Sequence, residues 1–164
     1  MNDILIEVFR YHAWASKTLI ACCRELSDEQ LDSPASGFGS IIATLSHTVR
    51  CDANYVAMLT GTPVPAPTAG DAADDLDQLE DLVNETARRW EQFLTDDVDG
   101  ERMLSLDGGH YECHATVVVA QAVHHGDAHR EQVRAGLQAL GVELPAVQPW
   151  GYALATGRAR SEKG

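Results

Sequence analysis

The sequence predicts an all-α protein, an antiparallel four-helix bundle with one short hairpin between its third and fourth long helices. Four segments repeat apolar residues at the spacing of an amphipathic helix. Breaks rich in glycine, proline or serine separate them, and only one pair of short segments has strand character. Long helices with moderate connections are typical of a bundle. The 164 residues fit one domain, residues 1–164.

The first two long helices are expected from their apolar stripes and their ends. The first is expected over residues 4–26. Its stripe consists of Ile4, Val8, Tyr11, Ala15, Thr18, Leu19 and Cys22. The second is expected to start after Ser40, a good N-cap residue, and to end at Gly61. Three prolines within residues 61–70 then predict an extended connection.

The third helix is expected over residues 72–95, with acidic residues near its N-terminus, where the helix dipole favours negative charge. The segments 103–106 and 110–113 flank an Asp-Gly-Gly turn and predict the hairpin. It would be marginal unless it packs on helices.

The fourth long helix is expected over residues 116–140, because Gly141 suits the position after a helix end. Residues 148–157 are expected to add a short helix or to cap the bundle.

Charge and composition exclude several classes of function. Twenty-five acidic side chains against twelve Lys and Arg give a net charge of −13, which disfavours nucleic acid and anionic membranes as partners. No apolar stretch approaches the roughly 20 residues that span a bilayer, and no signal peptide is recognised. The four cysteines form no disulfide framework, so we expect a cytoplasmic protein.

Histidine spacing is the main chemical signal in the chain. The seven histidines are His12, His47, His110, His114, His124, His125 and His129. His125 and His129 are four residues apart on a predicted helix, so their side chains can converge on one metal ion. Seven histidines produce such a pair by chance fairly often, so the spacing alone is a weak signal.

The surroundings of this pair strengthen the signal. Gln121, His125, His129 and Gln132 form a polar column on one helix face. If the column faced the bundle interior, its groups would need partners, and a divalent metal would supply one. The alternative is that the column faces solvent.

His47, in the middle of the second helix, is the candidate third ligand, although a lone helical histidine is more often a surface or hydrogen-bonded residue. Cys51 lies four residues further on and is an alternative sulfur ligand. A small buried side chain is the more common role of such a cysteine. His12 is expected on the helix surface.

Several local patterns resemble the DinB/YfiT-like family of metalloenzymes, which is unrelated to the DNA polymerase of similar name. The matching segments are Tyr11-His12-Ala13-Trp14-Ala15, Leu26-Ser27-Asp28-Glu29-Gln30-Leu31, Gly37-Phe38-Gly39-Ser40-Ile41 with Thr44-Leu45-Ser46-His47, and His125-Gly126-Asp127-Ala128-His129-Arg130-Glu131-Gln132. Two positions depart from the family pattern, Ala128 and Glu131, and neither is a proposed ligand.

The resemblance implies an antiparallel four-helix bundle with a divalent metal held by His47, His125 and His129. Zinc is the first choice, and nickel, manganese or iron fit the same ligands. Three histidines leave a coordination position open, as in catalytic sites. The resemblance also implies dimerisation, and it favours a low-molecular-weight thiol, because relatives include bacillithiol transferases and mycothiol-dependent isomerases.

The chemistry therefore has several readings. A metal can activate a thiol, for S-transfer or thiol-dependent isomerisation of a small molecule, or it can activate water, for a small-molecule hydrolase. A stress-related metal-binding protein without catalysis and a metal-free structural bundle are the remaining alternatives. Gln121 and Gln132 are expected to hydrogen-bond to the histidine ligands without binding the metal themselves.

No acid or base is identified from the sequence. The candidates are Asp52, Glu112, Asp127 and Glu131, each of which is more typically a surface acid.

Overall fold

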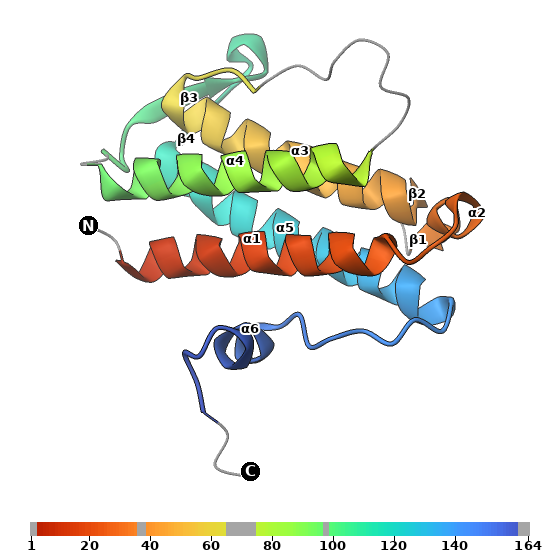
Figure 1. The fold of residues 1–164 in the computed structure, drawn as a ribbon. Coiled ribbons are helices and arrows are strands. Elements are labelled where there is room, and N and C mark those ends of the chain that lie inside the picture. Colours follow the sequence, from red (N-terminus) through yellow and green to blue (C-terminus); the bar gives the residue numbers. More distant parts are fainter. Residues whose placement is uncertain (1–2, 36–38, 65–74, 97–98, 161–164) are drawn as a thin grey trace.

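Four long helices form the fold in the computed structural model, which describes residues 3–35, 39–64, 75–96 and 99–160 (Figure 1). They are α1 (Asp3–Cys23), α3 (Ile41–Thr60), α4 (Leu76–Thr95) and α5 (Ala115–Ala139). The short elements are α2 (Asp28–Leu31), α6 (Pro149–Ala155), β1 (Pro34–Ala35), β2 (Gly39–Ser40), β3 (Met103–Leu106) and β4 (Tyr111–His114), with a single 3-10 turn over Asp107–Gly109.

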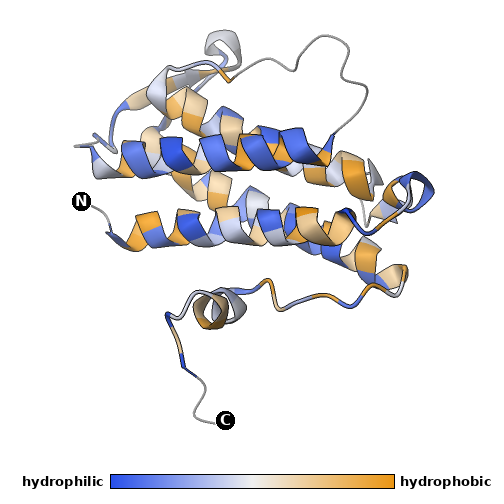
Figure 2. Ribbon diagram, viewed as in Figure 1, coloured by the Kyte–Doolittle hydropathy of each residue, from blue (hydrophilic) through white to orange (hydrophobic). Residues whose placement is uncertain are grey.

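The long helices pack as two antiparallel pairs, α1 with α4 and α3 with α5 (Figure 1). Later residues of α1 contact earlier residues of α4, as expected for antiparallel helices: Lys17 bonds to Asn84, and Arg24 bonds to Glu80. Contacts between α3 and α4 and between α1 and α5 close the bundle. The predicted all-α bundle is therefore confirmed. Figure 2 shows α4 with a mostly hydrophilic outward face.

The second predicted helix has the expected ends. The Ser40 side chain accepts a hydrogen bond from the backbone N–H of Ala43 at 3.3 Å, and this satisfies one of the free donors at the start of α3. Gly61 ends α3 in the left-handed conformation with φ 69°. Ser27 and Gln30 similarly form a capping box on α2, at the turn expected after α1.

The apolar stripe predicted for the first helix is only partly the stripe that faces the bundle. Ile6, Phe9 and His12 are buried there, whereas Ile4 is 79% exposed. Val8 and Tyr11 instead face α6, where they line one pocket with Tyr152 of that helix. Helix α1 is apolar on two sides because it packs against both the bundle and α6, and periodicity alone did not separate the two.

The remaining boundaries lie close to the predictions. Helix α4 begins at Leu76 with Asp75 as N-cap, and the predicted start at residues 72–74 lies outside the described residues, as do residues 65–70 of the connection. The hairpin is present, with β3 and β4 antiparallel in the register Leu104 to Cys113. The predicted tail helix is α6. Among the described helices, none has the length and apolar character that crossing a membrane requires.

The core consists of two apolar clusters separated by a polar layer. Along each long helix, residues of one cluster give way to residues of the other: Phe9 to Leu19 on α1, for example, and Ala122 to Val133 on α5. Between them lies the polar layer, with one residue from each long helix: His12, Asp52, Thr86 and Arg130.

Two expectations for this layer are wrong. His12 is only 3% exposed and packs against the Phe9 ring, so it is not a surface residue. Asp52 is not a surface acid: it is partly buried and accepts a hydrogen bond from the indole Nε1 of Trp90 at 2.9 Å. Burial raises the pKa of the Asp52 carboxyl to about 6, although the Trp90 hydrogen bond and the Arg130 charge oppose that rise.

Helices α3 and α5 approach closely where α5 carries Gly136. A Cβ built there would lie 2.8 Å from Cγ1 of Ile41 and 3.4 Å from the backbone of Ala35 on β1. Because glycine has no Cβ, α3 and β1 can both pack directly on α5 at this end of the bundle. This contact fixes the spacing of the two helices.

We expect Gly136→Ala to destabilise the protein by about 1–2 kcal/mol, because overpacking costs more than the gain in helix propensity. Urea unfolding of the metal-free protein measures the effect. In an Ile41→Ala background the space is open, so the same substitution should be neutral or stabilising. An equal cost in both backgrounds would contradict the assignment of this close contact.

We expect Asp52→Asn to change how stability depends on pH. Folding raises the pKa of Asp52 from 3.8 to about 6, so the folded protein holds this proton more tightly than the unfolded chain. The stabilisation is complete below about pH 4 and is lost as the pH rises through about 6. Relative to wild type, the variant should gain up to about 2–3 kcal/mol between pH 4 and pH 7.5.

Urea unfolding of the metal-free protein across this range tests the expectation. The exposed carboxyl of Glu112 supplies the matched control, Glu112→Gln. Parallel pH profiles for wild type and Asp52→Asn would show that the Asp52 carboxyl titrates alike in the folded and unfolded chain.

Candidate metal centre

Three histidines converge where α3 faces α5. His47 comes from the first half of α3, and His125 and His129 come from successive turns of α5. Each offers one ring nitrogen, and the three nitrogens lie within 4.8 Å of one another. The Nε2 atoms of His47 and His125 are 3.1 Å apart. The structure thus brings together the three residues expected to hold a metal.

The orientation of His129 is set by its neighbour Gln132. The two atoms Nδ1 of His129 and Oε1 of Gln132 lie 2.7 Å apart, and because the amide oxygen can only accept, Nδ1 carries the hydrogen. Nε2 is then the His129 ring nitrogen that carries no hydrogen, and it is the atom able to bind a cation. A second-layer acceptor on the far ring nitrogen is the usual partner of a metal-binding histidine.

Burial keeps the imidazoles in the form that binds metals. It lowers the pKa of His125 to about 4, and nearby imidazoles, led by His129, act in the same direction. Burial also lowers the pKa of His47, and His129 again adds to the effect. Both rings are therefore neutral near pH 7 and need lose no proton to bind a cation.

The donor set fits a divalent cation. Two imidazole nitrogens at about 2.0–2.1 Å from a tetrahedral ion are separated by about 3.4 Å, close to the separation of the His47 and His125 nitrogens. All three rings are partly exposed, so solvent reaches the cluster. The cluster is compatible with a divalent-metal site, and three nitrogen donors leave room for a further ligand.

Cys51 lies beside the cluster without joining it. Its Sγ is 3.7 Å from both ring nitrogens of His47, but it does not belong to the group of ligand atoms that converge. The side chain is partly buried, not fully buried as expected for a small core residue.

Tyr55 is a site residue that the sequence analysis missed. Its ring meets His125 edge to face, with ring centroids 5.6 Å apart. Tyr55 follows His47 by eight residues and Cys51 by four, so all three share one face of α3. That spacing is visible in the sequence, but a tyrosine among apolar helix positions is by itself no sign of a site.

The two glutamines of the predicted polar column differ in their contacts. Gln132 contacts His129 as described above, whereas Gln121 is exposed and its amide donates to the Tyr55 hydroxyl at 3.4 Å. Gln121 therefore lies at the rim, next to Tyr55. The predicted alternative, a column that faces solvent, applies to Gln121 alone, because the other three members are partly buried.

The remaining histidines lie apart from the cluster. His114 is exposed at the start of α5, with Nδ1 2.8 Å from the carbonyl oxygen of Glu101. His110 and His124 are exposed, and His12 is in the polar layer. Only the pair on α5 and His47 of α3 form a group of three metal-binding side chains within the described residues.

Three of the four acidic residues considered as bases are held by other groups. Asp52 accepts from Trp90, Asp127 from Arg130 at 2.5 Å, and Glu131 from Arg134 at 2.7 Å. The fourth, Glu112, is exposed on β4.

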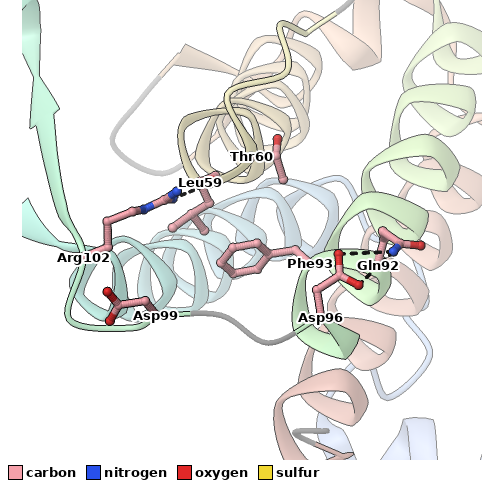
Figure 3. A pocket seen from close by; sticks show the side chains of 7 residues that line it. All are labelled: Leu59, Thr60, Gln92, Phe93, Asp96, Asp99 and Arg102. Atoms are coloured by element: carbon pink, nitrogen blue, oxygen red, sulfur yellow. Dashed lines mark hydrogen bonds between the residues drawn. The ribbon is translucent and has the colours of Figure 1, made fainter.

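A separate polar cavity of about 400 Å³ lies at the far ends of α3 and α4 (Figure 3). Its polar groups bond to one another: the Arg102 guanidinium donates to the Leu59 carbonyl oxygen at 2.6 Å, and the Gln92 amide donates to Asp96 at 3.1 Å. Leu59 follows His47 by twelve residues on α3, or about 18 Å along the helix axis. This cavity is therefore distinct from the histidine cluster.

Two comparisons with known proteins bear on the family of this chain. The sequence model of the DinB family matches residues 1–161. A protein named Protein DinB, from Bacillus subtilis (strain 168), is 24% identical over 174 aligned residues, which cover 99% of this chain and 99% of that protein. The chain belongs to the DinB family.

Proposed function

We propose that the protein is a divalent-metal-dependent enzyme in which His47, His125 and His129 hold the ion and a small-molecule thiol is the activated reactant. The observation that carries this proposal is the convergence of three imidazole nitrogens on one partly exposed point. The reaction class is S-transfer to an electrophile or thiol-dependent isomerisation. Zinc is the expected ion, and nickel, manganese or iron are the alternatives.

A divalent cation bound there supplies Lewis acidity, which lowers the pKa of a thiol or water in its open position. The chain's own residues supply the rest. Gln132 holds the His129 ring in the tautomer that binds through Nε2. Tyr55 and Gln121 place a hydroxyl and an amide at the rim, where they can bind polar groups of a substrate.

The contacts of the acidic residues favour a thiol over water as the activated group. A hydrolase of this kind commonly uses a carboxylate to remove a proton from water and pass it to the leaving group. Here Asp52, Asp127 and Glu131 are held by Trp90, Arg130 and Arg134. A thiol, whose ordinary pKa is near 8.5, loses its proton to solvent more readily and has less need of such a base.

We further propose a cytoplasmic enzyme that acts as a homodimer and takes no nucleic acid or membrane as partner. The net charge of −13 supports the last point.

We expect about one equivalent of metal per chain in wild-type protein purified without chelator or affinity tag, and a marked loss in His125→Ala. The variant removes one of three nitrogen donors, so the remaining pair holds the ion far more weakly. Elemental mass spectrometry on both proteins measures this. His124→Ala is the matched control, because His124 is the exposed neighbour of His125.

The same proteins then test the chemistry. A panel of low-molecular-weight thiols with electrophiles should show turnover in wild type and none in His125→Ala. Bound metal with ester hydrolysis instead of thiol transfer would favour the hydrolase. Bound metal without any turnover would favour a metal-binding protein without catalysis, and no metal after reconstitution would overturn the proposal.

We expect Gln132→Ala to weaken metal binding by about 10- to 100-fold, as is typical when the hydrogen-bond partner of a metal ligand is lost. Gln132→Glu keeps an acceptor for His129 Nδ1 and should retain the affinity. Gln121→Ala is the control, because its amide contacts Tyr55 and not an imidazole. Competition titrations with a chromophoric chelator measure all three, and unchanged affinity in Gln132→Ala would contradict the assigned role.

A further inference from the structure

Helices α3 and α5 carry no Asp, Glu, Lys or Arg over the halves that lead away from the cluster toward the β3–β4 hairpin. Residues 53–60 of α3 and 115–126 of α5 are free of all four residue types, although 23% of the whole chain is charged. At that average, the twenty positions of these two segments, eight on α3 and twelve on α5, would contain four or five charged side chains. The two uncharged halves lie side by side, since α3 and α5 are antiparallel neighbours.

Four side chains of these halves form an uncharged strip: Tyr55, which is partly buried, and Met58, Val117 and Gln121, which are exposed. Tyr55 and Gln121 touch, and Tyr55 also contacts His125, so the strip starts at the cluster. Met58 is one turn beyond Tyr55, and Val117 is one turn before Gln121. Because the helices are antiparallel, both steps run in the same direction, away from the histidines. Met58 is 46% and Val117 52% exposed.

In the opposite direction, toward β1, the seam between α3 and α5 is closed by packed residues. Two turns beyond His129, Gly136 is covered by Ile41 and by Ala35 of β1, with no space for a Cβ. The Glu131–Arg134 ion pair adds charge to the helix at this end. A molecule whose reacting end reaches the three histidines can therefore extend along the seam only toward the uncharged strip.

From this asymmetry we propose that the substrate of the cluster carries an uncharged, apolar or aromatic portion, which lies along Tyr55, Met58 and Val117 while its reacting end meets the histidines. The proposal rests on the proposed function, since it describes the substrate of the same site. A methionine adapts to varied apolar shapes, and the Tyr55 ring offers a face for stacking. A charged tail would lose its hydration on this surface and find no opposite charge among the strip residues to replace it.

The test uses metal-binding probes with one head group and different tails, on the full-length protein loaded with Co²⁺. Acetohydroxamate has no tail, 4-phenylbutanohydroxamate has an apolar tail, and 5-carboxypentanohydroxamate has a charged tail. Dissociation constants come from the visible Co²⁺ spectrum and from calorimetry. The phenyl probe should bind at least about tenfold more tightly than acetohydroxamate, because each buried methylene is worth about fourfold. The carboxylate probe should gain nothing.

Variants locate the effect on the strip. Met58→Glu and Met58→Gln should each remove most of the preference for the phenyl probe and leave acetohydroxamate affinity unchanged. Both replace an exposed side chain, so folding is not at risk. Leu154→Glu, on α6 and 55% exposed, is the matched control and should keep the preference.

Equal affinity for all three probes, or a preference that persists in Met58→Glu, would overturn the inference and leave the metal centre intact. Failure of wild-type protein to bind Co²⁺ would overturn the proposed function and the inference with it.

Discussion

The close antiparallel packing of α3 on α5 is the constraint on which the histidine cluster depends. His47 reaches the two histidines of α5 only because the helix axes are held at a spacing that Gly136 permits and Ile41 fills. One turn of α5 places His125 next to His129, and the packing of α3 on α5 brings the His47 ring beside both, with its centroid 4.8 Å from that of His129 and 5.0 Å from that of His125. A wider seam would separate the donors while leaving every helix intact.

Helix α5 also packs into the core through a second face, about 100° around the helix from the histidines. Gly126 and Arg130 directly follow the two histidines in sequence and point into the polar layer, where a Cβ on Gly126 would lie 3.0 Å from the guanidinium and 3.2 Å from His12. Arg130 is buried, bonds to Asp127 and lies over the Tyr11 ring at 5.7 Å from its centroid. Burying such a charge is costly unless it is paired, and these contacts supply the pairing. In each of the pairs His125-Gly126 and His129-Arg130, the histidine thus belongs to the cluster and the residue after it packs in the core.

The sequence predicted the helices, the hairpin and the His125–His129 pair because each depends on local spacing, whereas His47 was expected as the third ligand from the family resemblance. Ser40 and Gly61 are end signals that act within one turn, and His125 and His129 need only helical geometry to align. The burial of His12 and Asp52 was predicted wrongly and the role of Tyr55 was missed, because the surroundings of all three come from other helices. Trp90 of α4 partners Asp52, and His125 of α5 meets Tyr55, 38 and 70 residues away in the chain respectively. Ile4 was misplaced for the same reason, since α6 lies at the far end of the chain.

The charges around the cluster determine which kind of substrate, charged or neutral, could approach a bound ion. Two cations that follow the histidines on α5 are paired with acids, Arg130 with Asp127 and Arg134 with Glu131, and the rings of His47 and His125 are neutral near pH 7. A divalent ion held at the cluster would add local positive charge to a protein whose net charge of −13 repels anions at long range. A substrate that approaches as a neutral molecule and becomes anionic only at the ion avoids that repulsion. A thiol does so, and an uncharged tail suits the same route.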